Sequence, residues 1–168
     1  MNFKNEIVLN GQLGPNGLAL TNEVDRSYRT GAELSVNYKI DDHIHLINNS
    51  SYNYSRIKEQ TESFAPILTP PVIINQEVTY NRKAFLIGVS ARFQGRSFIN
   101  FANTAQVNQY VTLNARVQYD IKHFQFGIFV NNITNTKYFN NGYVDTDGTK
   151  KYFVQSPANF YTSVKYTF

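Results

Sequence analysis

The chain of 168 residues contains no cysteine and no tryptophan, one methionine and five prolines. The absence of cysteine excludes a disulfide framework and a thiolate metal site. Charged residues make up only 17% of the chain, against roughly 25% in ordinary globular domains. No run of about 18 apolar residues is present, which excludes a transmembrane helix. The net charge of +4 is spread along the chain, so no basic cluster predicts a nucleic-acid partner.

Aromatic residues are abundant instead: 12 Tyr and 13 Phe bring the aromatic share to 15%. Asn, Thr, Ser, Gln and Tyr take the place of the missing charges. This mixture suits β-strands with one apolar face and one polar but mostly uncharged face. The length predicts a single domain over residues 1–168.

Apolar and polar residues alternate along most of the chain, with the period of two that is typical of β-strands. The clearest case is 28–40, which places these residues on one face: Tyr28, Thr30, Ala32, Leu34, Val36, Tyr38 and Ile40. Similar patterns occur in 74–81, 85–93, 111–120, 124–130 and 160–168. The alternation is weaker in 44–56, and 3–9 is a less certain eighth strand. Phe129 is an exception that falls on a polar face.

The predicted connections alternate between short and long. Residues 41–42, 82–83 and 122–123 are short breaks that suit tight hairpins. The polar segments 10–27, 58–73, 97–108 and 135–157 are long. Antiparallel strands of an outer-membrane barrel have this arrangement, with tight periplasmic turns and extended extracellular loops.

Strand length and aromatic placement also favour a membrane barrel. A membrane strand needs about 9–11 residues, and 28–40 and 84–94 reach that length. Aromatic residues lie near the strand ends, as in the girdles at the two membrane interfaces. A soluble β-domain with these aromatics in its core is the less favoured interpretation.

Four short segments, in order along the chain, resemble TonB-dependent outer-membrane receptors. Residues 130–138 read Val-Asn-Asn-Ile-Thr-Asn-Thr-Lys-Tyr, and 156–161 read Ser-Pro-Ala-Asn-Phe-Tyr before the last strand. Residues 25–33 (Asp-Arg-Ser-Tyr-Arg-Thr-Gly-Ala-Glu) and 95–98 (Gly-Arg-Ser-Phe) are also similar to family segments. The resemblance covers essentially the whole chain.

The resemblance implies an all-β, antiparallel transmembrane barrel of 22 strands, of which this chain supplies about the last eight. It also implies active uptake of a scarce nutrient such as a siderophore, cobalamin or glycan, with energy supplied through TonB. TonB contacts the family's N-terminal plug, which has no counterpart here, so we expect the isolated chain not to transport. Met1 is therefore expected to be an internal start or the result of a truncation.

A self-standing eight-stranded outer-membrane barrel with a structural or adhesion role is the alternative. It requires the first strand to pair with the last. Its interior would be packed with charged residues: Arg29, Glu33, Lys39, Arg82, Arg92, Arg116, Asp120 and Lys165.

No enzyme constellation or cofactor motif is present. His43 and His45 lie on one strand face without a third ligand, and we interpret them as turn residues. Residues 145–148 lack the further ligands of a calcium loop and are interpreted as a polar turn. Because the family binds ligands through extracellular loops and the upper lumen, we expect ligand contacts from the aromatic residues of the last long loop: Tyr138, Phe139, Tyr143, Tyr152 and Phe153.

The chain ends on a strand that places Val164, Tyr166 and Phe168 on its apolar face. This ending resembles the signal that the barrel-assembly machinery reads in outer-membrane proteins. We predict that deletion of Phe168 impairs membrane insertion, measured by cell fractionation, without changing any ligand contact. Unaltered assembly in cells would contradict this role.

Overall fold

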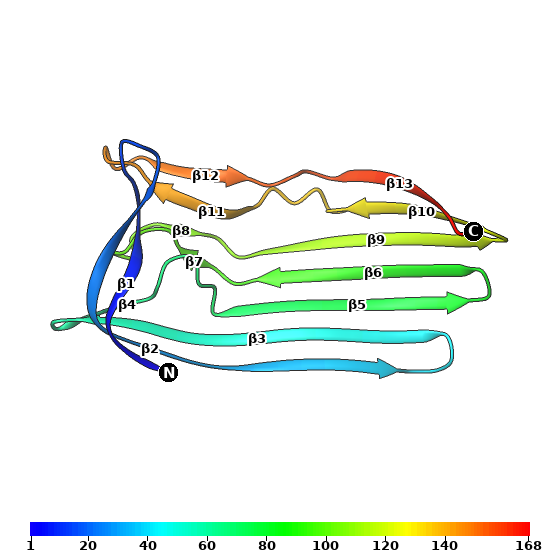
Figure 1. Cartoon of the computed structure of the whole chain (residues 1–168), viewed down its shortest axis with the longest axis horizontal. Helices are drawn as coiled ribbons and strands as arrows, with labels where there is room; N and C mark the ends of the chain where they lie inside the picture. The colour runs from blue at the N-terminus through cyan, green and yellow to red at the C-terminus, as the bar shows by residue number, and fades with distance from the viewer.

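The computed structural model describes all residues 1–168 and consists of antiparallel β-strands (Figure 1). The main sheet has the order β1-β2-β3-β5-β6-β9-β10-β13, with β4 paired beside β3. Its path strands are β1 (Asn2–Leu13), β2 (Ala19–Lys39), β3 (Ile44–Glu59), β5 (Val72–Arg82), β6 (Phe85–Gln94), β9 (Tyr110–Ile121), β10 (Phe124–Asn131) and β13 (Asn159–Tyr166). The all-β antiparallel class predicted from the period of two is confirmed. No helix of the structure is long and apolar enough to span a bilayer.

Tight turns gather at one end of the sheet, on the right in Figure 1. Lys83 and Lys122 adopt positive φ angles of 54° and 52°, which allows β5–β6 and β9–β10 to be joined by two residues. Between β2 and β3, Asp41 Oδ1 accepts the backbone N–H groups of His43 and Ile44, both at 2.7 Å. The three predicted hairpins are therefore present.

Longer connections gather at the opposite end and contain short strands of their own. These are β4 (Glu62–Phe64), β7 (Ser97–Phe98), β8 (Gln106–Val107), β11 (Phe139–Val144) and β12 (Lys150–Val154). β7 pairs with β8, and β11 pairs with β12. The alternation of short and long connections is thus retained, although the long ones are partly ordered as hairpins.

One predicted boundary is wrong: residues 10–27 are not a loop. β1 continues to Leu13 and β2 already begins at Ala19, and the two pair from Asn2 with Tyr28 to Leu13 with Ala19. The polar composition of this stretch suggests a loop, but cross-strand pairing holds both strands extended beyond the apolar band. β1 consequently pairs only with the half of β2 that lies nearer the long connections, which we call the upper end of the sheet.

The sheet is open. β1 pairs only with β2, and β13 pairs only with β10, so the first-to-last pairing that a self-standing barrel requires is not formed. The edge of β2 from Thr30 to Lys39 has no partner on the side of β1, whereas the backbone of Arg29 is hydrogen-bonded to Met1. Seven strands therefore run the full height of the sheet: β2, β3, β5, β6, β9, β10 and β13.

One face of the sheet is an exposed apolar band. The registers place apolar residues of neighbouring strands side by side, for example Val78 beside Val89 and Ile128 beside Val117. No element covers this band: Leu34 is 59% exposed and Val164 is 64% exposed. Only 17 of the 168 residues are buried, which is far too few for a soluble domain of this length and fits a sheet that faces lipid on one side.

A small polar cluster interrupts the apolar band and explains the weak alternation predicted for 44–56. Asn48 Nδ2 donates to Gln76 Oε1 at 2.8 Å across β3 and β5. Ser50 Oγ donates to Asn48 Oδ1 at 2.8 Å, and Gln76 Nε2 donates to the Ile47 carbonyl at 3.2 Å. These bonds give each polar side chain a partner away from water.

Two compact cores lie at the loop end. Val8, Val24 and Ile57 form one, against Phe64 and Phe101. The other comprises Ile99, Ala105 and Val107, with Leu68, Phe139 and Val144 packed against it. The long connections therefore form a packed layer over the upper rim of the sheet.

Asn132 ties the two ends of the connection between β10 and β13 together by hydrogen bonds of its side chain. Its side chain is almost fully buried, at 3% exposure. The Oδ1 atom accepts the Thr136 N–H at 2.9 Å, and Nδ2 donates to the carbonyls of Thr136 at 2.9 Å and Ser156 at 3.2 Å. This residue is the second Asn of the 130–138 motif, so the motif has a structural role here.

The terminal strand also has its predicted orientation. Val164 pairs with Phe126, and the Tyr166 ring packs 4.9 Å from that of Phe124. The Phe168 ring lies 5.1 Å from Tyr166 and is fully exposed. The assembly role of these three residues stays a prediction.

Substitution Asn132→Ala removes three buried hydrogen bonds and places Ala at a φ of 50°. We expect it to destabilise the closing connection by about 3 kcal/mol, because a buried hydrogen bond contributes on the order of 1 kcal/mol. Faster proteolytic cleavage in 135–157, measured on the protein in isolated membranes, tests this. Asn131→Ala is the matched control, since it removes a single exposed hydrogen bond, to Asn159. Equal cleavage of the two variants would contradict the role of Asn132.

The backbone hydrogen bonds from His43 and Ile44 lower the pKa of Asp41. A lowered folded-state pKa means that the carboxylate stabilises the turn above the unfolded pKa of about 3.9. This stabilisation is lost as the pH falls through the folded-state pKa. The protection of the turn amides, which is their exchange rate relative to the intrinsic rate at the same pH, should therefore fall in acid to that of Asp41→Ala. Asp41→Asn keeps an acceptor that does not titrate and should show no such step, and a wild type that matches Asp41→Ala at neutral pH would refute the prediction.

Candidate functional site

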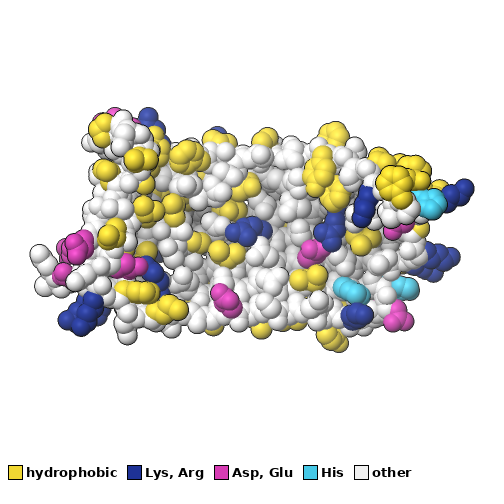
Figure 2. All heavy atoms as spheres, in the orientation of Figure 1, with side chains coloured by type: hydrophobic (Ala, Val, Ile, Leu, Met, Phe, Trp, Pro, Cys, Tyr) yellow, Lys and Arg dark blue, Asp and Glu magenta, His cyan; other side chains and the backbone are white.

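The face of the main sheet opposite the apolar band is polar, and it carries the charged residues that lie midway along the strands. Figure 2 looks onto this face: isolated basic and acidic side chains stand among white, mostly uncharged polar groups. Registers place Asn49 beside Asn75, Asn75 beside Arg92, and Arg92 beside Thr112. The period of two in the sequence predicted this face.

A recess of about 470 Å³ lies on this face, near the loop end. Arg92 stands in its wall, where Nη1 donates to Asn75 Oδ1 at 2.9 Å and Nη2 donates to Gln94 Oε1 at 3.1 Å. Gln94 is itself buried and also accepts the Tyr110 hydroxyl at 3.0 Å. These bonds fix the guanidinium beside Thr112 and Asn114, which also line the recess.

A second recess of about 250 Å³ shares Glu77, Ser90, Asn114 and Asn131 with the first. Here Arg116 Nη2 lies 2.5 Å from Glu77 Oε1. The stem of Arg116 crosses Gly88, where an added Cβ would lie 3.1 Å from Arg116 Cγ. The absence of a side chain at Gly88 therefore lets Arg116 lie flat against the wall. Arg116 Nε has no hydrogen-bond acceptor there.

Aromatic rings border both recesses. Tyr138 lines the first recess and packs against Tyr110, with ring centroids 4.4 Å apart and ring planes tilted by 38°. Phe129 and Tyr161 line the second and stack almost in parallel at 4.6 Å. Phe129 thus lies on the polar face, as its place in the sequence predicted. Together the two recesses offer guanidinium, amide and hydroxyl groups beside flat aromatic surfaces.

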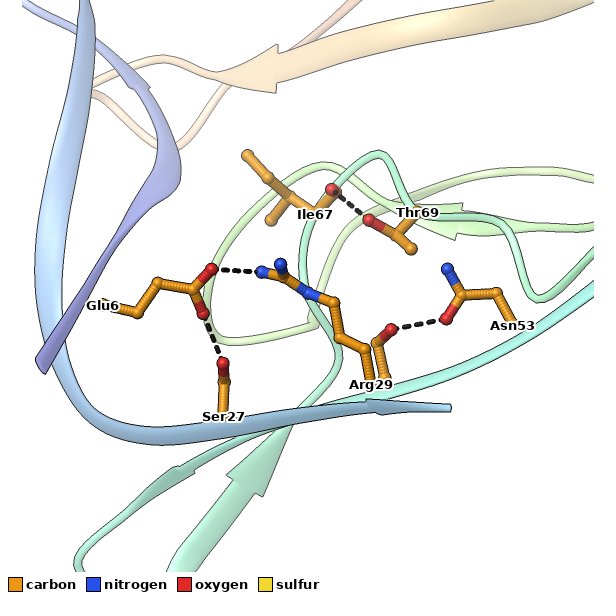
Figure 3. Close-up of polar contacts among 7 residues, drawn as sticks. Glu6, Ser27, Arg29, Asn53, Ile67 and Thr69 are labelled. Atoms are coloured by element: carbon orange, nitrogen blue, oxygen red, sulfur yellow. Dashed lines mark hydrogen bonds and ion pairs between the residues drawn. The ribbon is translucent and has the colours of Figure 1, made fainter. Parts of the chain in front are cut away.

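A further ion pair holds the upper rim of the polar face together (Figure 3). Arg29 Nη2 lies 2.5 Å from Glu6 Oε1, and Ser27 Oγ donates to Glu6 Oε2. The Arg29 guanidinium also lies over the Phe3 ring, 5.0 Å from its centroid. The pair therefore joins β1 to β2, and it borders a third hollow lined in part by Thr69.

The predicted packed ionic interior is not formed. Of the eight charged residues expected to build it, only Arg29 and Arg116 form ion pairs, and both pair with acids outside that set, Glu6 and Glu77. Sequence reasoning missed Glu77, although its alternation with Asn75 places it on the polar face. Glu6 had no such signal, because the positive φ of Asn5 (52°) disturbs the alternation of β1.

The five aromatic residues expected to contact ligand lie in different environments. Phe139 and Tyr152 pack together at 5.2 Å, and the Tyr152 hydroxyl donates to the Gln106 carbonyl at 3.2 Å. Tyr143 and Phe153 lie 6.1 Å apart on the β11–β12 hairpin, with Phe153 51% exposed. Tyr138 alone lines the recess beside Arg92. The structure therefore does not bring all five together.

Of the other sequence candidates, His43 and Asp147 lie in turns, whereas His45 lies in β3, between Lys39 and Thr79, so its interpretation as a turn residue is wrong. His43 Nδ1 lies 3.1 Å from the Asn81 carbonyl. The Thr149 backbone N–H donates to Asp147 Oδ1 at 2.8 Å and lowers the pKa of that carboxyl. No group of three or more His, Cys, Asp or Glu side chains is arranged to hold a metal ion.

Solved structures with the same fold are outer-membrane uptake proteins. The siderophore receptor PiuA from Acinetobacter baumannii aligns with 98% of the chain, with a TM-score of 0.75 and 19% identity. The ferric yersiniabactin uptake receptor FyuA from Yersinia pestis aligns with 89%, at 0.77 and 13%. The ferric citrate transporter FecA aligns with 85%, at 0.78 and 21%.

The chain spans about a quarter of the length of these structures: 24% of PiuA, 25% of FyuA and 24% of FecA. No curated protein matches its sequence. A family model described as "TonB dependent receptor-like, beta-barrel" matches residues 1–133. The chain therefore belongs to the TonB-dependent receptor-like β-barrel family.

Proposed function

We propose that residues 1–168 form the C-terminal part of the barrel of an outer-membrane receptor that takes up a scarce nutrient. The family consists of transporters and receptors rather than enzymes. The exposed apolar band and the polar opposite face support insertion in a membrane with the recesses facing the lumen. TonB would act on a plug contributed by another part of the receptor, and the barrel-assembly machinery would read Val164, Tyr166 and Phe168.

The single observation that carries the ligand class is the presence of two guanidinium groups in the polar wall, one held by neutral amides and the other beside Glu77. Arg92 and Arg116 stand beside Asn and Thr side chains and near the Tyr138 and Tyr161 rings. Guanidinium groups bind carboxylate and other anionic oxygens well, particularly through two parallel hydrogen bonds. The wall therefore suits an oxygen-rich, anionic metal chelate of the siderophore class better than a neutral glycan.

The open sheet argues against the self-standing barrel. In lipid, each unpaired backbone group costs several kcal/mol, and the edges of β2 and β13 would be left bare. Further strands on both edges would satisfy these groups. The receptor proposal supplies them, because the full barrel of the family continues beyond this sheet.

Arg92→Gln in the receptor as its gene encodes it should weaken binding of a ferric chelate by about 10- to 150-fold, as loss of a charge-assisted hydrogen bond costs roughly 1.5–3 kcal/mol. A panel of ⁵⁵Fe-labelled carboxylate, catecholate and hydroxamate chelates would identify the class in a whole-cell binding and uptake assay. Arg92→Lys keeps the charge without the two-pronged geometry and should show an intermediate loss.

Lys165→Gln is the matched control. Lys165 is on β13 and lies on the same polar face of the sheet as Arg92, but it is beside Gln125 and away from the recesses. It should bind and transport as the wild type does. A wild type that takes up no chelate of the panel, or an Arg92→Gln variant with unchanged affinity, would overturn the proposed ligand class.

A further inference from the structure

Three basic residues form a row across three neighbouring strands, on the outward side of the sheet. The register pairs Lys4 of β1 with Arg26 of β2, and Arg26 with Lys58 of β3. All three side chains are exposed. Like charges placed directly opposite each other on adjacent strands destabilise a sheet. The row therefore lowers the stability of the sheet unless an anion neutralises its charge.

No anion within the chain does so. The two ion pairs of the structure join Arg29 to Glu6 and Arg116 to Glu77. Asp25 and Glu59 are the chain neighbours of Arg26 and Lys58, yet neither forms an ion pair with the row. The charge of Lys4, Arg26 and Lys58 is thus available to a partner from outside.

Aromatic residues lie directly below the row. The next register pair is Tyr28 with Arg56, followed by Thr30 with Tyr54. The rings of Tyr28 and Tyr54 lie 5.8 Å apart, and the Arg56 guanidinium lies 4.6 Å from the Tyr54 centroid. Leu34 and Val36 of the apolar band follow further along β2. The row therefore stands just above an aromatic girdle, at the height where lipid headgroups meet the acyl region.

A hollow of about 270 Å³ lies between the basic residues, lined by Lys4, Arg26, Lys58, Tyr28 and Asn2 among others. It faces away from the polar wall that carries Arg92 and Arg116. Figure 1 places this part of β1, β2 and β3 toward the end with the long connections. A soluble ligand that crosses the lumen would not meet it.

We infer that Lys4, Arg26, Lys58 and Arg56 form a binding site for the phosphate-bearing headgroup of an anionic lipid in the outer leaflet of the membrane. The inference rests on the proposed outer-membrane location. Lysine and arginine beside a membrane surface attract anionic headgroups, and an arginine binds phosphate through paired hydrogen bonds. The acyl chains of such a lipid would lie along the apolar band below Tyr28 and Tyr54.

The test uses the receptor as its gene encodes it, in nanodiscs that contain a bisphosphorylated glycolipid, with lipid retention measured by native mass spectrometry after extraction. The triple variant Lys4→Gln, Arg26→Gln, Lys58→Gln should retain the lipid about one hundred-fold less well. This follows because each basic residue near a membrane surface contributes about five-fold to the affinity for anionic lipid. Lys39→Gln, Lys83→Gln, Lys122→Gln is the matched control, with three charges removed at the tight-turn end, and should retain the lipid normally.

Three further measurements keep the inference falsifiable. The same glycolipid without phosphates should not be retained, and inorganic phosphate should not compete. Arg26→Gln alone should weaken retention by several-fold and Arg26→Lys should restore most of it, which gives a result even where the triple variant fails to fold. Equal retention of both glycolipids, competition by inorganic phosphate, or normal retention by the triple variant would each overturn the site.

Chelate uptake separates this inference from the proposed function. The triple variant should transport as the wild type does, because its residues face away from the lumen. A wild type that retains the phosphorylated lipid but takes up no chelate would refute the ligand proposal and leave the lipid site standing.

Discussion

The pairing of backbone N–H and C=O groups between neighbouring strands is the constraint on which the rest of this structure depends. Lipid supplies no hydrogen-bond partner, so each strand of a membrane sheet must satisfy its backbone through its neighbours. The registers that result place apolar residues on one face and Asn, Thr, Ser and Arg on the other. The recesses and the row of cations are consequences of these registers.

The strand positions and the short turns were predictable because the period of two persists through each full-length strand. The 10–27 hairpin was not, since its residues are mostly polar and only isolated ones, such as Val24, enter a core. The ion pair between Glu77 of β5 and Arg116 of β9 was also missed: it reaches across β6, and no local pattern indicates the registers that bring the two side chains together. Asn132 was visible as part of a motif, but its buried hydrogen bonds were not.

The two basic sites differ in what their neighbours do to the charge. Arg92 and Arg116 are held by amides and a carboxylate in a wall beside aromatic rings, so their positions are fixed before any ligand arrives. Lys4, Arg26 and Lys58 repel one another and have no acidic partner. The geometry of the first site thus suits the proposed selective recognition of a chelate, and that of the second suits the proposed lipid headgroup.

The hydrogen bond between Asn48 and Gln76 has a consequence for assembly. It forms only when β3 and β5 are correctly aligned, because it joins directly opposed residues. A slip of two residues would keep every side chain on its proper face and would escape any penalty from hydrophobic patterning. It would, however, break the bond between the two amides and leave Asn48 Nδ2 and Gln76 Oε1 without partners, at a cost of several kcal/mol in an apolar environment. This polar pair therefore acts as an alignment check on a sheet whose apolar residues alone cannot tell one even register from the next.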